Sequence, residues 1–209
     1  MPDAKACRGT DSVRDAKARI RAEMRARRAQ LSPAAVAEAG AAVARSLQSL
    51  PVVAGARRVA AYRAVRGEIP VDVLLEGERR EVFTLPRVSG EDLEFVAWHA
   101  GQTFAPGSFG IPEPVGGTVV ALADHDAVLV PLTAFDGRGR RLGQGGGFYD
   151  RALASRPSGS GSGQLRPAAI GVAYSFQQVA RIPQDRWDVP LDAVATDAGV
   201  LIAPGGLLE

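Results

Sequence analysis

The chain is poor in the residues that build covalent or metal centres. It contains one cysteine, Cys7, and two histidines, His99 and His125, among 209 residues. A single cysteine cannot form an internal disulfide or a metal cluster, and this usage is typical of a reducing compartment. Neither histidine has a partner at metal-binding or catalytic-triad spacing. The sequence therefore excludes an internal disulfide scaffold, and Cys7, near the N-terminus, is a poor candidate for a nucleophile.

Long apolar segments are absent as well. The N-terminal stretch of residues 1–19 is charged and has no apolar centre, so it does not resemble a secretory signal. The longest apolar run, "AVLVPLTAF" at 127–135, is too short to span a bilayer. These two absences predict a soluble, cytoplasmic protein with no membrane partner.

The basic charge is concentrated at one end of the chain. Residues 1–30 hold nine Lys or Arg and four Asp or Glu, a balance of +5, whereas the remainder holds 16 basic and 19 acidic residues, a balance of −3. Such local basicity favours one anion-binding site over a surface coated for nucleic acid. We expect a disordered tail over 1–12, a flexible Gly/Ser insertion over 156–167, and a monomer with a single domain over 13–209.

The pattern of apolar residues predicts a helical start followed by alternating strands and helices. A helix is expected from about Val13 to Gln30, and Ser32 with Pro33 begins a second one. Further helices are expected at 69–80 and 147–155, and strands at 57–65, 81–88, 93–100, 125–135, 168–176 and within 189–204. Residues 101–117 read as a loop rich in Gly and Pro.

This alternation predicts the fold class. The nearly continuous apolar run at 125–135 is typical of a central parallel strand covered on both faces. We expect an α/β fold, a single three-layer domain with a mostly parallel central sheet flanked by helices, preceded by an N-terminal helical pair. In such sheets ligands bind beyond the carboxyl ends of the strands.

A glycine-rich loop follows that central strand. In "RLGQGGGFYD", residues 141–150, four glycines fall within five positions just before a helix. Glycine is costly there relative to alanine, so a bare backbone that approaches a phosphate is one explanation. The loop matches neither the P-loop signature nor a dinucleotide-binding fingerprint. A flexible turn beside a surface arginine explains the loop equally well.

Several charged residues are candidates for the same site, each with a plainer alternative. Asp150 can hold Mg²⁺ next to a phosphate or simply favour a helix start, and Asp192 is a possible second carboxylate or a turn residue. Lys17 and Arg21 lie one turn apart and can reach one polyphosphate, although a solvated basic face is the more frequent outcome. Glu68 ends a strand and can grip a paired donor on a heterocycle, or cap a helix.

Taken together and in order, these residues resemble the 5-formyltetrahydrofolate cyclo-ligase family. The motifs that carry the resemblance span residues 17 to about 197. They are the Lys17 and Arg21 pair, the acid Glu68 after a strand, "LPR" at 85–87, "FGIPEP" at 109–114, "LDAV" at 191–194 and, most specifically, "RLGQGGGFYD".

The resemblance implies a reaction and a set of residues. It implies ATP as co-substrate, Mg²⁺, and 5-formyltetrahydrofolate as the small-molecule substrate. Catalytic roles would fall to Arg141 and Gln144, and metal binding to Asp150 and Asp192. ATP would contact Lys17, Arg21, Arg141, Leu142, Gly143, Gln144, Gly145, Gly146, Gly147, Phe148 and Tyr149. The folate would contact Arg63, Glu68, Phe109, Gln144, Gly145, Gly146, Gly147 and Phe148.

Two departures from the family pattern stand out. Many members have tyrosine where this chain has Phe148, and some have a basic residue in the loop where it has Gln144 and Gly146. If a cation there acts on the substrate, Arg141 or a residue from elsewhere must replace it. Two alternatives remain open at this point: a paralogue that binds ATP but acts on another small substrate, and a non-catalytic module that binds a nucleotide or RNA.

Overall fold

The computed structural model describes residues 12–156 and 167–208, so most of the expected tail and of the expected insertion lie outside the described residues. The helices are α1 (Val13–Arg28), α2 (Pro33–Gln48), α3 (Pro51–Ala54), α4 (Asp72–Leu75) and α5 (Phe148–Ala154), with 3₁₀ turns η1 (Arg80–Val82), η2 (Ser108–Gly110), η3 (Leu122–Asp124) and η4 (Ser175–Gln177). The part of the chain that is described contains no helix with the length and apolarity needed to cross a membrane.

The central sheet has eight strands in the order β12-β11-β10-β7-β1-β2-β3-β6. Its five central strands, β11 to β2 in that order, are joined by parallel pairings, and antiparallel strands extend it at both edges. The strands are β1 (Val59–Ala60), β2 (Phe83–Ser89), β3 (Asp92–Ala97), β6 (Val119–Val120), β7 (Ala127–Pro131), β10 (Ala168–Val172), β11 (Ala193–Thr196) and β12 (Gly199–Ile202). The predicted mostly parallel sheet is confirmed.

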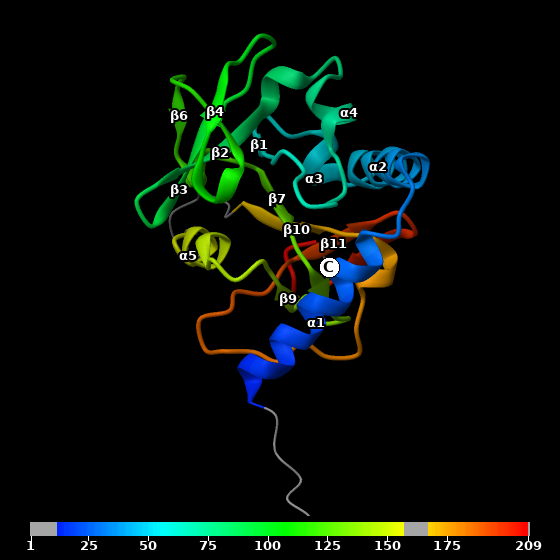
Figure 1. Ribbon diagram of the computed structural model, residues 1–209. Coiled ribbons are helices and arrows are strands. Elements are labelled where there is room, and N and C mark those ends of the chain that lie inside the picture. Colours follow the sequence, from blue (N-terminus) through cyan, green and yellow to red (C-terminus); the bar gives the residue numbers. More distant parts are fainter. Residues whose placement is uncertain (1–11, 157–166, 209) are drawn as a thin grey trace, which may run out of the picture.

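Alternating residues of the central strands bury opposite faces of the sheet. In β7, Ala127 and Leu129 pack into the core on the side of α2, α3 and α4, whereas Val128 and Val130 pack on the other side, where Leu153 of α5 contributes. Because successive side chains of a strand point to opposite faces, only a continuous apolar run can fill both cores. Figure 1 shows the resulting three layers, with α2 and α5 on opposite sides of the sheet.

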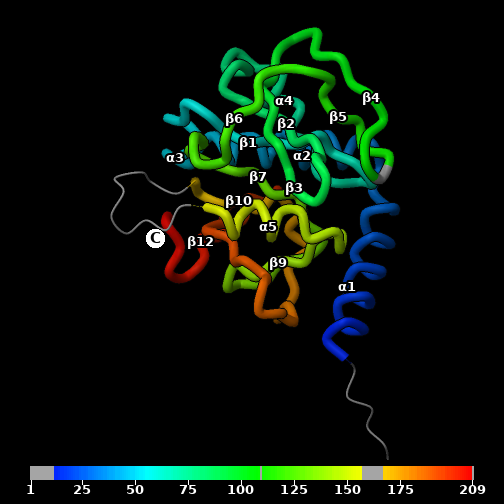
Figure 2. Tube along the Cα trace, turned by 90° about the vertical axis from the view of Figure 1, so that its left-hand side faces the viewer, coloured from blue at the N-terminus to red at the C-terminus, as the bar shows by residue number. Residues whose placement is uncertain are grey.

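The first two helices begin as expected but do not pack as a pair. The Ser12 and Ser32 hydroxyls accept hydrogen bonds from the first-turn amides of α1 and α2. While α2 covers the sheet, Met24 of α1 packs against the small hairpin of β8 (Ala134–Phe135) and β9 (Arg141–Leu142). Figure 2 shows α1 along the outside of the domain, with its first turns pointing away from it.

The helix expected over 69–80 is reduced to α4 and the turn η1, and the strand expected over 125–135 ends at Pro131. Two further segments also differ from the sequence-based expectation. The strand expected over 57–65 is paired only at Val59 and Ala60, after which the chain leaves the sheet toward a tight turn at Arg66 and Gly67. The loop expected over 101–117 contains the antiparallel pair β4 (Phe104–Pro106) and β5 (Pro112–Pro114). Both segments border the cavity described next.

Candidate active site

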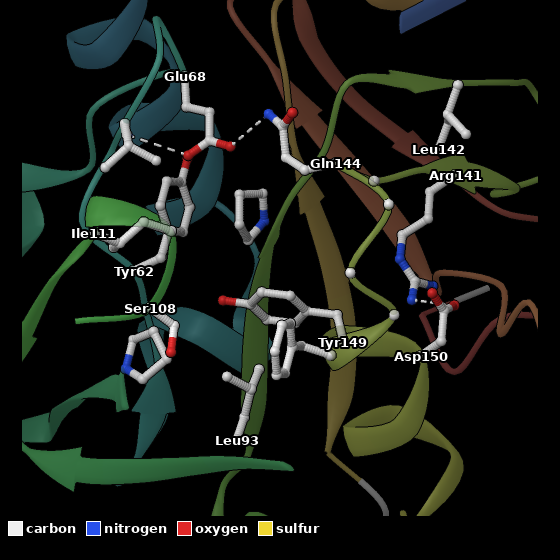
Figure 3. A pocket seen from close by; sticks show the side chains of 18 of the residues that line it. Tyr62, Glu68, Leu93, Ser108, Ile111, Arg141, Leu142, Gln144, Tyr149 and Asp150 are labelled. Carbon is white, nitrogen blue, oxygen red and sulfur yellow. Dashed lines mark hydrogen bonds and ion pairs between the residues drawn. The ribbon is translucent and has the colours of Figure 1, made fainter. Parts of the chain in front are cut away.

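A cavity of about 770 Å³ opens at the carboxyl ends of the central parallel strands. Its lining comes from eight segments: residues of α1, the turn after β1, the ends of β2 and β7, Leu93 of β3, the β4–β5 region, the glycine loop with the start of α5, and the loop 185–188. Figure 3 shows Glu68, Tyr62 and Tyr149 around one part of the cavity, and Arg141 with Asp150 on the opposite side of the glycine loop. This is the place where α/β sheets bind ligands.

Glu68 is held at the cavity by a strained turn. Arg66 has φ +53° and Gly67 φ +74°, and the amide of Glu68 donates to the carbonyl of Val65 over 3.0 Å, which closes the turn. A positive φ is costly for arginine, and such strain gathers at functional sites. The turn points a 6% exposed carboxylate inward.

The electrostatic surroundings of Glu68 are mixed. Burial raises the pKa of its carboxyl group, while the Val65 amide, the Gln144 side chain and the charges of Arg28 and Arg66 lower it in part. Its Oε2 accepts from the Val65 amide at 3.2 Å and its Oε1 from Gln144 Nε2 at 3.3 Å. The carboxylate therefore has acceptor capacity left for a donor in the cavity.

One row of cations on α1 contacts the rest of the protein. Lys17 Nζ contacts Asp185 Oδ2 at 2.8 Å and Asp188 Oδ2 at 2.7 Å, and Arg21 Nε donates to the carbonyl of Gly143 at 2.9 Å. The two turns that follow use Arg25, bound to Gln144, and Arg28, bound to the carbonyl of Leu132. The basic face therefore anchors the helix to the site, which disfavours its use as a nucleic-acid surface.

The Lys17 contacts fix the loop 185–188. Burial alone would lower the pKa of Lys17, but hydrogen bonds to Asp185 and Asp188 outweigh it and leave that pKa raised. Asp188 Oδ2 also accepts from the Asp185 amide at 2.8 Å. Within this loop Trp187 lines the cavity while 61% exposed, which is unusual for so large an apolar side chain.

The glycine loop adopts conformations that glycine alone takes cheaply. Gly145 has φ +110°, and Gly147 has φ +70° at the residue preceding α5. A Cβ atom at Gly145 would lie 3.8 Å from the Arg21 guanidinium, and one at Gly146 only 2.9 Å from the Phe148 ring. The loop thus needs glycine for both its path and its packing.

Arg141 and Asp150 form an ion pair at the base of this loop. Arg141 Nη2 lies 2.6 Å from Asp150 Oδ1, and the Arg141 side chain is only 4% exposed. Arg141 also donates to the carbonyl of Val189, whose amide donates to Asp150 Oδ1 at 3.3 Å. Arg141 therefore ties the loop to Asp150 and to the residue after Asp188.

The two carboxylates expected to bind metal lie in different places. Asp150 lines the cavity, whereas Asp192 is absent from the described lining and pairs with Arg156 Nη1 at 3.0 Å, both side chains being 3–4% exposed. Asp192 Oδ2 also accepts from the Ala169 amide at 2.8 Å. These contacts give Asp192 a structural role. The carboxylates that line the cavity with Asp150 in place of Asp192 include Asp185 and Asp188 of the loop 185–188.

The structure places most of the other residues expected to contact the ligands in the cavity lining. Arg63 lines the cavity, lies 3.3 Å from Asp72 and sits over the Phe104 ring. Phe109 falls within η2, but its side chain lies outside what the structure describes. Leu142, Phe148 and Tyr149 line the cavity with the loop glycines. The buried Tyr149 hydroxyl has no hydrogen-bond partner within the described protein.

Sequence reasoning missed the apolar wall and the loop 185–188. The apolar wall is formed by Tyr62, Leu85, Val88, Leu93, Phe104 and Ile111. These residues look like ordinary core positions in the sequence. Asp188 stands four residues before Asp192, on the other side of "VPL", and no local pattern separates the two. Only the contact with Lys17, 171 residues away, marks Asp188 as part of the site.

The fold and the cavity define an α/β protein that binds a small molecule where a glycine loop, a buried carboxylate and a row of cations meet. Residues 13–197 match the model of the 5-formyltetrahydrofolate cyclo-ligase family, and the chain belongs to that family.

Relatives and solved structures agree with this assignment. The chain is 33% identical to the 5-formyltetrahydrofolate cyclo-ligase of Escherichia coli (strain K12), over 85% of this chain and 98% of the relative. It is 34% identical to that of Haemophilus influenzae, over 82% and 92% of the two chains. The solved 5,10-methenyltetrahydrofolate synthetase of Aquifex aeolicus matches with a TM-score of 0.73 and 34% identity, over 89% of this chain and 92% of that one.

Proposed function

We propose that this protein converts 5-formyltetrahydrofolate into 5,10-methenyltetrahydrofolate, using ATP and Mg²⁺ and releasing ADP and phosphate. The observation that carries the proposal is the meeting of Glu68, the apolar wall and the glycine loop in one cavity of about 770 Å³. A flat, polar-edged heterocycle and a polyphosphate need these two kinds of surroundings side by side. Family membership supports the folate substrate.

The folate ring would bind on the Glu68 side. The apolar wall offers flat contact surface, and Glu68 presents a carboxylate that can accept two parallel N–H groups from the ring edge. Because burial raises the pKa of the Tyr149 phenol, this group stays protonated and can donate its unpartnered O–H to a ring oxygen. Both groups lie on the same side of the glycine loop (Figure 3).

The phosphates would bind on the α1 side of the loop. Arg21 lies against Gly145, and Lys17 lies on the same helix face one turn earlier. The Trp187 indole, exposed beside the loop, offers a stacking surface for a purine. Asp150 and Asp188 are carboxylates in the same cavity wall and fit Mg²⁺, which takes a few carboxylates together with substrate phosphates. Bound there, Mg²⁺ would neutralise phosphate charge.

The chemistry follows from the poor leaving ability of the formyl oxygen. Transfer of the γ-phosphoryl group to that oxygen releases ADP and activates the formyl carbon. The lone pair of N10 then attacks this carbon, the C–O bond breaks, phosphate leaves and N10 loses its proton, which closes the ring. Such a transfer depends on positioning and charge neutralisation, which the loop, Lys17 and Arg21 can supply.

The direct test mixes the purified protein with 5-formyltetrahydrofolate, ATP and MgCl₂ and follows the absorbance of the methenyl product. We expect product only when all three are present, with one ADP formed per turnover. Product formation without ATP, or ATP hydrolysis unaffected by the folate, would contradict the proposal. A Lys17→Met variant should keep folate affinity while losing ATP affinity, because it removes a phosphate contact and releases the loop 185–188 that Lys17 holds.

A further inference from the structure

Arg25 contacts the glycine loop from outside the cavity. Its Nη2 donates to Gln144 Oε1 at 2.9 Å, one turn along α1 from the bond between Arg21 Nε and the Gly143 carbonyl. Unlike Arg21, Arg25 is exposed and does not belong to the described cavity lining. It therefore touches the site only through Gln144.

The Gln144 side chain joins Arg25 to Glu68. Its Oε1 faces Arg25 and its Nε2 donates to Glu68 Oε1 at 3.3 Å (Figure 3). A guanidinium has only donors and a carboxylate only acceptors. The amide can therefore satisfy both neighbours in one orientation alone, with its oxygen toward Arg25. Turned around, it would place an oxygen against the carboxylate and an NH₂ against a cation.

We propose that Arg25 is a positioning residue that fixes the amide orientation of Gln144 and thereby keeps Glu68 aimed at the substrate ring. The proposal rests on the proposed function in one respect, that Glu68 binds the folate. It also explains why this loop can carry the neutral Gln144 in place of a basic residue. The positive charge is supplied by Arg25 on α1 and acts through the Gln144 amide. Glu68 then receives a fixed donor on Oε1, while the Val65 amide holds Oε2 at 3.2 Å.

Loss of the fixed orientation has a titration consequence. Burial raises the pKa of Glu68, and the Gln144 hydrogen bond is among the contacts that lower it. Without Arg25 the amide can turn its oxygen to the carboxylate, so the pKa of Glu68 rises further. The other groups that face Glu68 are unchanged by this substitution: Arg28, Arg66, Tyr62 and Tyr149.

The decisive variant is Arg25→Glu, because a carboxylate at this position demands the NH₂ end of Gln144 and turns the amide around. We expect KM and Kd for 5-formyltetrahydrofolate to rise about tenfold, because one charge-assisted hydrogen bond is lost. The Kd for ATP should stay within about twofold of the wild-type value. Arg25→Lys, which still offers only donors, should restore wild-type values. Arg45→Glu on the exposed end of α2 makes the same charge change away from the cavity and should alter neither constant.

Combining Arg25→Glu with Gln144→Leu tests whether Arg25 acts as a relay, meaning through the Gln144 amide, or through its charge alone. If Arg25 acts through the amide, Arg25→Glu adds nothing to Gln144→Leu, whereas additive effects overturn the proposal. An unchanged folate KM in Arg25→Glu, or an equal loss of ATP affinity, also overturns it. Carbon NMR of the Glu68 carboxyl in the substrate-free protein gives an independent readout: its pKa should be higher in Arg25→Glu and not in Arg45→Glu. If wild type fails to turn over the folate, the proposed function falls, while this titration still decides the relay.

Discussion

The pair between Arg141 and Asp150 gives a measurable energetic prediction. Asp150→Asn keeps the side-chain volume but removes the charge that lies 2.6 Å from a guanidinium with 4% exposure. Breaking a fully buried pair costs about 3–5 kcal/mol. Here Asp150 is 29% exposed, the Asn oxygen can still accept, and the Val189 carbonyl remains a partner, so we expect a loss of about 2 kcal/mol.

Urea unfolding measures this loss, and Asp15→Asn is the matched control. Asp15 also lies in the first turn of a helix, is exposed, and accepts a hydrogen bond only from Ser12 Oγ among the contacts described. Helix-dipole interactions alone are worth about 0.3–1 kcal/mol. A loss at Asp150 no larger than at Asp15 would refute the reasoning. So would a coupling energy near zero in the double-mutant cycle with Arg141→Met.

Three further predictions concern ligand binding. Glu68→Gln should weaken 5-formyltetrahydrofolate binding at least tenfold, because a paired charged acceptor is lost. ATP binding, measured by calorimetry, should be unchanged. An equal loss of both affinities would contradict the assignment of Glu68 to the folate. Asp188→Asn should raise the Mg²⁺ concentration needed for half-maximal activity. Asp192→Asn should instead lower the free energy of unfolding by about 3 kcal/mol and leave the Mg²⁺ requirement unchanged. The reverse pattern would indicate that Asp192 binds the metal. In a Trp98→Phe variant, ATP should quench the fluorescence of Trp187, and inorganic triphosphate should not.

The sequence predicted the parts of this protein that local patterns encode. The capped starts of the first two helices, the doubly covered strand at 127–131 and the helix after the glycine loop are confirmed because capping residues, apolar runs and glycine clusters act over short distances. Family membership is confirmed for the same reason, since the glycine-loop motif is contiguous.

The sequence could not predict contacts between distant segments. Asp188 and Asp192 look alike in "WDVPLDAV", and only the partners Lys17 and Arg156, brought by the fold, give one to the cavity and the other to the core. The early end of β1 could not be predicted either, because only Gly67 marks the strained turn at Arg66 in the sequence. Burial and pairing depend on the whole chain.

The contact between Lys17 and Asp188 also orders the events of synthesis. The two residues are 171 positions apart, and translation proceeds at about 5–20 residues per second, so Lys17 waits on the order of 10 s for its partner. Until then Lys17 lacks both of its carboxylate partners, whereas the partners of Arg21, Arg25 and Arg28, at residues 132–144, have already been synthesised. The loop 185–188 is thus the last part of the cavity lining to be synthesised.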